Sequence, residues 1–163
     1  MRYILALLFA LVSVSVLATP VPAHATWTVA DQKDPMTDEV TTVASVMLFN
    51  AQAYTLPTAV VMCRPDGTIG VVISTGDILD GPGFVPLRYR IDDQPAKDAQ
   101  AMVLRDSLYA GIHVGAVELA KSLQHGETLL VEITKYNGLP STRKYPLIGS
   151  RAAIGVVLRT CGY

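Results

Sequence analysis

The sequence contains few of the groups that usually carry enzyme chemistry or bind nucleic acid. Its 163 residues include three histidines, two cysteines and one tryptophan, and 13 basic residues stand against 14 acidic ones. Arg143-Lys144 is the sole pair of adjacent basic residues, so no basic run exists. Proteins that bind nucleic acid or an anionic membrane need clustered positive charge. The composition therefore argues against both kinds of partner.

Motifs for catalysis or metal binding are also missing. His113 and His125 are too far apart to ligate one metal from a single helix face. Asp92-Asp93 lies just before Pro95, in a region typical of a solvated turn, and a strand would point its two side chains to opposite faces. Gly81-Pro82-Gly83 lacks the lysine and following helix of a phosphate loop. We predict no catalytic residue, no metal site and no cofactor.

The first 25 residues have the pattern of a cleavable export signal. Arg2 precedes an apolar stretch from Ile4 to Leu17, and Ala23-His24-Ala25 is a small-x-small cleavage site. The stretch is shorter than the roughly 20 residues that span a bilayer, and no cysteine follows for a lipid anchor. We predict a signal peptide over 1–25 and a periplasmic mature protein without a stable membrane anchor. The alternative is an uncleaved anchor.

Cys63 and Cys161 form an even pair in a chain expected to reach an oxidising compartment. Such a count favours one disulfide. Two unrelated buried thiols are the alternative. A catalytic cysteine is disfavoured because no histidine lies near either residue in the sequence.

The hydrophobic pattern predicts one α+β domain over 26–163. Strand-like segments dominate, and Pro65-Asp66-Gly67 separates two apolar runs in the manner of a hairpin turn. Gly126 and Gly162 are expected to cap the ends of two helices, and Ser150 to cap the start of the second. We expect an antiparallel sheet or small sandwich with both helices packed on it. The expected strands are 27–29, 40–48, 59–64, 68–74, 85–91, 101–104, 128–134 and 142–147, and the helices are 112–124 and 150–161.

Arg88 and Arg90 are the predicted partner-binding residues. The alternating run from Val85 to Ile91 places both guanidinium groups on one strand face, where they could bind carboxylates of a partner. The alternative is pairing with Asp92, Asp106 or another local acid. Trp27 and Tyr163, near the two ends of the predicted mature chain, are either aromatic residues at the core edge or contact residues for a partner.

Short segments along the chain resemble the VasI family, also called TagO, of periplasmic proteins associated with type VI secretion. The similarity lies in their order and spacing, and the chain departs from the family by ending in Tyr163 where tryptophan is usual. The matching segments are Trp27-Thr28-Val29, Thr37-Asp38-Glu39, Cys63-Arg64, Tyr89-Arg90-Ile91-Asp92, Leu119–Leu123, Leu129–Asn137, Pro140 and Leu158–Tyr163.

The resemblance implies an exported, non-enzymatic accessory or adaptor protein with paired cysteines. It would act through contacts with proteins of the cell envelope, type VI secretion components among them. The alternative from a different class is a stand-alone periplasmic binding module or an inhibitor of an envelope hydrolase. An unrecognised envelope enzyme is the third hypothesis.

Overall fold

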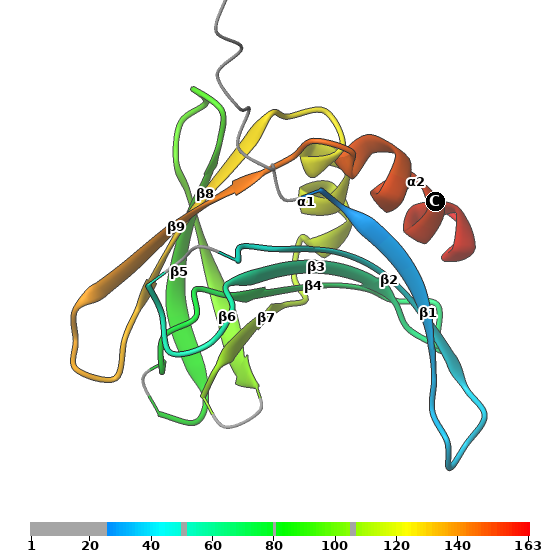
Figure 1. Ribbon diagram of the computed structural model, residues 1–163, viewed down its shortest axis with the longest axis horizontal. Helices are drawn as coiled ribbons and strands as arrows, with labels where there is room; N and C mark the ends of the chain where they lie inside the picture. Colours follow the sequence, from blue (N-terminus) through cyan, green and yellow to red (C-terminus); the bar gives the residue numbers. More distant parts are fainter. Residues whose placement is uncertain (1–25, 50–51, 80, 105–106) are drawn as a thin grey trace, which may run out of the picture.

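A computed structural model describes residues 26–49, 52–79, 81–104 and 107–163 and shows one antiparallel sheet of nine strands with two helices. The predicted α+β class and antiparallel sheet are confirmed, and the sheet is continuous in the order β1-β2-β3-β4-β7-β6-β5-β8-β9 (Figure 1). The predicted signal peptide lies outside the described residues. The elements are β1 (Thr28–Lys33), β2 (Val40–Met47), β3 (Thr58–Cys63), β4 (Ile69–Ser74), β5 (Phe84–Ile91), β6 (Lys97–Leu104), β7 (Tyr109–Ile112), α1 (Ala116–Leu123), β8 (Thr128–Thr134), β9 (Pro140–Pro146) and α2 (Ser150–Thr160).

Alternating residues make one face of the sheet apolar. Val61 on β3 pairs with Val71 on β4, and both are almost fully buried. The turn at Pro65-Asp66-Gly67 joins these strands as predicted, because Asp66 accepts the backbone N–H of Thr68 at 2.9 Å. Both helices lie on this side of the sheet, with α2 over β2 and β3 and α1 over β4 (Figure 1). Among the described residues, no helix is long and apolar enough to cross a membrane.

The sheet curves strongly, so that β5, β8 and β9 run at a steep angle to β3 and β4 (Figure 1). The curvature brings β9 back towards the end of β4, and the buried Tyr145 hydroxyl donates to the carbonyl of Ser74 at 2.7 Å. Burial raises the pKa of this phenol. The hydroxyl thus stays protonated and the hydrogen bond holds the two parts of the sheet around one core.

The second helix ends as the sequence predicts. Gly162 has a φ of 82°, its N–H donates to the carbonyl of Arg159, and the N–H of Tyr163 donates to that of Leu158. This pair of bonds is a Schellman motif. The start differs from the prediction, because Gly149 is the N-cap and the Ser150 hydroxyl instead donates to the carbonyl of Leu123 in α1 at 2.8 Å. Ser150 therefore joins the two helices.

The first helix is shorter than predicted. Ile112, the first residue of the predicted helix 112–124, instead ends the strand β7 and pairs with Val71. Gly126 does not have the positive φ expected of a glycine cap. A Cβ at this position would lie 2.4 Å from Cγ2 of Ile91, so close packing against the core requires glycine here. The first strand is longer than the predicted 27–29, because β1 runs to Lys33 and pairs with β2 along its length.

The predicted Cys63–Cys161 disulfide is confirmed. It joins the last residue of β3 to the residue after α2, with Cα atoms 5.5 Å apart. Cys161 is partly buried and packs against the core. The bond therefore fixes the terminal helix on the sheet.

Candidate functional site

Arg88 lies in a row of alternating charge on the outer face of the sheet. Its Nε donates to Oδ1 of Asp98 at 2.9 Å, and Glu132 stands opposite it on β8. The hydrogen bond to Asp98, aided by both carboxylates, raises the pKa of Arg88. The side chains of Arg88 and Asp98 are 60% and 79% exposed, so this pair contributes little to stability. Arg88 thus pairs with a local acid that the sequence analysis did not name.

The other predicted binding residues lie apart from Arg88. Arg90 is exposed on the same strand face and makes no salt bridge within the described ranges. Trp27 is only 5% exposed and its indole N–H donates to the carbonyl of Pro146. Tyr163 is 52% exposed after α2, where Nζ of Lys121 lies 5.7 Å from its ring centre. The structure places these residues on different elements and does not bring them into one site.

The polar residues set aside in the sequence have local partners. Asp92 accepts the backbone N–H groups of Glu127 and Thr128, and these bonds lower its pKa. Nδ1 of His113 lies 2.9 Å from Nη2 of Arg64, and that of His125 lies 2.8 Å from the carbonyl of Lys121. No cluster of metal-ligating side chains occurs in the part of the chain that the structure describes.

A cleft opens where β6 extends beyond β7. β7 pairs only with Met102–Leu104, so the edge of β6 from Lys97 to Ala101 has no neighbouring strand among the described residues. The segment His113–Gly115 then leads away into α1. We call the resulting hollow, of about 490 Å³, the β6 cleft. Its lining includes Tyr89, Asp98, Ala99, Gln100, Ile112 and Leu119, with Phe84 and Val114 at the exposed rim.

A second candidate is the loop-end surface, where three segments meet. The N–H of Thr55 donates to the carbonyl of Gly76, and the N–H of Tyr136 donates to that of Ile78. These bonds gather large apolar side chains at one end of the molecule. We define the loop-end surface by Tyr54, Leu56, Ile78, Tyr136 and Leu139, which are 74%, 44%, 37%, 64% and 56% exposed.

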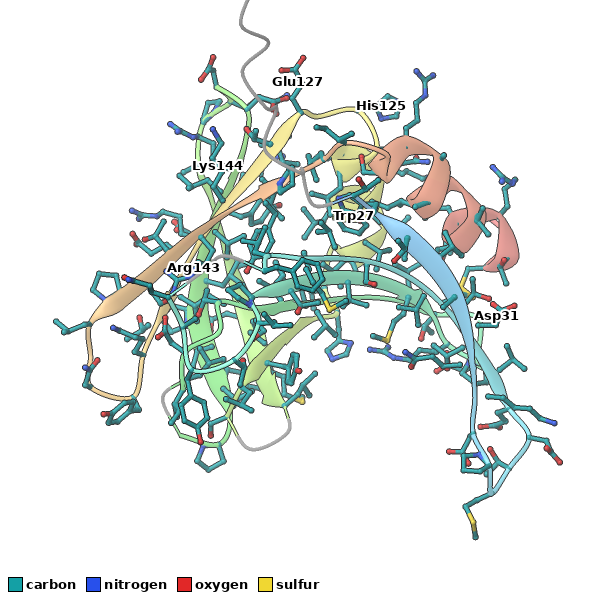
Figure 2. The ribbon with its side chains drawn as sticks, viewed as in Figure 1. Trp27, Asp31, His125, Glu127, Arg143 and Lys144 are labelled. Atoms are coloured by element: carbon teal, nitrogen blue, oxygen red, sulfur yellow. A yellow bond between two sulfur atoms is a disulfide. The ribbon has the colours of Figure 1, made fainter. Side chains whose placement is uncertain are left out.

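A half-buried polar cluster supports the loop-end surface. Oδ2 of Asp77 accepts from the Ser141 hydroxyl at 2.6 Å and lies 3.2 Å from Nη2 of Arg143. Arg143, on β9 (Figure 2), also donates to the carbonyl of Gln52 at 3.3 Å. Ser141 is 3% exposed, so its hydroxyl is unsuited to act as a nucleophile. The cluster holds the two loops against β9.

Sequence reasoning missed both surfaces. The β6 cleft depends on the pairing of strands, because the edge is open only where β7 stops. The loop-end surface combines residues that are far apart along the chain. The one sequence signal for the loop-end surface was the presence of tyrosines in turn segments, such as Tyr54 and Tyr136 beside Asn137-Gly138. The structure shows that both are exposed.

Comparison with known proteins reveals a similar fold. No family model and no curated protein matches the chain. A crystal structure of invasion associated protein B from Bartonella henselae is similar with a TM-score of 0.59 and 13% sequence identity. The similarity covers 86% of this chain and 96% of that chain. At this identity the shared property is the fold.

Proposed function

We propose that the protein is an exported, non-enzymatic accessory or adaptor protein associated with type VI secretion, which acts in the periplasm through contacts with other proteins. The VasI/TagO resemblance and the signal-like start of the sequence support this proposal. The disulfide between sheet and terminal helix is compatible with an oxidising compartment.

The loop-end surface is the observation that carries the proposal. Tyrosine and arginine are enriched among residues that dominate binding energy at protein interfaces. Tyr54 and Tyr136 expose most of their surface, and the Asp77–Arg143 pair fixes the segments beside them. Exposed aromatic side chains on segments that are already held in place lose little conformational freedom when a partner binds, which favours affinity.

Affinity capture from periplasm, followed by mass spectrometry, tests this function. The protein should recover type VI secretion components, and deletion of its gene should reduce secretion. Tyr54→Ser with Tyr136→Ser should weaken the capture by about tenfold or more, as removal of contact residues commonly does. If no secretion component is recovered and deletion leaves secretion intact, the proposal is wrong.

Met36→Ser provides the matched control. Met36 is 89% exposed in the β1–β2 hairpin, which projects at the opposite end of the molecule from the β8–β9 hairpin (Figure 1). Its replacement removes a comparable apolar side chain and should leave capture unchanged. Recovery of an envelope hydrolase in place of secretion components would favour the inhibitor function instead.

A further inference from the structure

The open edge of β6 presents backbone groups that a strand could pair with. The N–H of Val103 donates to the carbonyl of Gly83, on the β5 side. Successive residues of an antiparallel strand alternate in direction, so Ala101 and Ala99 also face β5. Asp98 and Gln100 therefore direct their N–H and C=O groups towards the β6 cleft. Pro86, which lacks an N–H, stands opposite Gln100 and fits this assignment.

The free backbone groups of β6 lie beside an apolar floor. Ile112 and Leu119 are buried, and the half-buried Tyr89 has no hydrogen-bond partner for its hydroxyl among the described residues. A side chain opposite Ala99 would point towards this floor, since directly opposed residues share a face. The outer edge strands differ, because β9 begins and ends with proline and all six residues of β1 are exposed.

Charge across the sheet indicates which residue would stand opposite Asp98. Glu132, Arg88 and Asp98 are aligned in register across β8, β5 and β6, with the signs negative, positive and negative. A strand added beside β6 would supply the next place in this row. Opposite charges in facing positions stabilise a strand pair. A lysine or arginine opposite Asp98 would therefore continue the alternation of charge across the strands.

We propose that the β6 cleft binds an extended segment of a partner protein as an added antiparallel strand, with a basic side chain facing Asp98 and an apolar side chain facing Tyr89, Ile112 and Leu119. This mode is β-augmentation, in which backbone bonds give affinity and alternate side chains give specificity. The inference rests on the proposed function as a protein-binding module and specifies where and how one partner segment is held.

A synthetic hexapeptide of alternating lysine and valine, blocked at both ends, is the probe. It is titrated into the purified, disulfide-bonded protein, and amide hydrogen exchange is followed by NMR. The amides of Asp98 and Gln100 should exchange more slowly with peptide bound. The amides of Ala99 and Ala101, already directed at β5, should change little. Absence of binding at about 1 mM peptide, or of protection at Asp98 and Gln100, would overturn the proposal.

Methylated peptides test the orientation. Lysines opposite Asp98 and Gln100 would form the bonded pairs, whereas the valines would turn their amides away. N-methylation of the lysine amides should therefore abolish binding, and N-methylation of the valine amides should preserve most of it. Equal effects of the two modifications would contradict the added strand.

Two variants of the protein complete the test. Gln100→Pro removes one N–H that faces the cleft and should weaken binding about fivefold, whereas Gln100→Ala keeps that N–H and should bind normally. Asp98→Lys should weaken binding of the lysine peptide and improve binding of a glutamate–valine peptide. Circular dichroism confirms that each variant is folded. If Asp98→Lys does not shift the preference from the lysine peptide to the glutamate peptide, Asp98 does not have the proposed role.

The outcome can be separated from that of the proposed function. If periplasmic capture depends on Tyr54 and Tyr136 while the peptide does not bind, the adaptor function stands and the β6 cleft is not a docking site. If the peptide binds as described but no secretion component is captured, the cleft stands and the type VI assignment falls.

Discussion

Trp27 joins the two outer edges of the sheet. At the start of β1 (Figure 2), its indole N–H donates to the carbonyl of Pro146, the last residue of β9, at 3.0 Å. Its backbone N–H also donates to the carbonyl of Ile148 at 3.3 Å. β1 and β9 lie at opposite ends of the strand order, so one residue connects the sheet's first and last strands. The sheet is thus held closed around its core at this corner.

Two replacements of Trp27 remove different amounts of the buried side chain. Trp27→Phe removes the donor to Pro146 and part of the ring system, and should lower the free energy of unfolding by about 1–2 kcal/mol. Trp27→Ala also removes the buried ring and should lower it by about 3–5 kcal/mol. Urea denaturation followed by circular dichroism measures both. Equal losses in the two variants would mean that ring packing contributes little.

The disulfide makes a second prediction about stability. Cys63→Ser with Cys161→Ser opens a loop with a sequence separation of 98. Chain-entropy theory gives about 4–5 kcal/mol for a loop of that length. The serine variant should therefore unfold at much lower urea concentration than the oxidised protein. Adding reductant to the wild-type protein should reproduce the loss, and reductant should not affect the serine variant.

The strands were predictable because their signals are local. Alternation over Val85–Ile91 and the Pro65-Asp66-Gly67 turn between two apolar runs depend on neighbours in the chain, and the structure confirms both. β7 was missed because it has only four residues and its last residue, Ile112, was assigned to the helix predicted over 112–124. Tertiary contacts decide between the two, since Ile112 pairs with Val71.

Gly126 shows why glycine was misread. A glycine after a helix commonly caps it, but the same residue is also required where two parts of a core approach closely. The position of Ile91 beside Gly126 is set by the fold and cannot be read from adjacent residues. The open edge of β6 is hidden in the same way, because it depends on where a different strand ends.

The close approach at Gly126 predicts opposite effects for two substitutions. Gly126→Ala places a Cβ 2.4 Å from Cγ2 of Ile91 and 2.9 Å from Cδ1 of Leu147, so stability should fall by about 1–3 kcal/mol. Gly155 lies inside α2, where an added Cβ meets only the ends of Gln124 and Arg159. Gly155→Ala should raise stability by up to about 1 kcal/mol through helix propensity. Thermal unfolding of the two variants compares them directly.

Arg88 and Arg90 should matter little for folding. Arg88→Ala with Arg90→Ala breaks one exposed ion pair, so the free energy of unfolding should change little. If these residues contact a partner, capture should weaken, and more so at low salt than at high salt. Normal capture by the folded double variant would indicate that the partner contacts the loop-end surface or the β6 cleft instead. Unfolding of the variant would show a structural network that includes this pair.

Asp92 gives a prediction that depends on pH. Its φ is 50°, and its carboxylate accepts from the backbone N–H of Thr128 at 2.8 Å and of Glu127 at 2.9 Å. These bonds hold its pKa below the ordinary value, so the folded state favours the ionised form. The unfolded chain binds the proton more readily, and the contribution to stability is present above about pH 4 and lost as pH falls through the folded pKa.

Two substitutions at Asp92 separate the charge from the backbone conformation. Asp92→Asn keeps an acceptor oxygen and tolerates the left-handed backbone, whereas Asp92→Ala does neither. At pH 7 the melting temperature should fall in the order wild type, Asp92→Asn, Asp92→Ala. The difference between wild type and Asp92→Asn should narrow as the pH is lowered, because protonation removes the charge that distinguishes them. Melting curves from pH 7 to pH 3 measure this, and a gap that is constant with pH would show that the carboxylate charge contributes nothing.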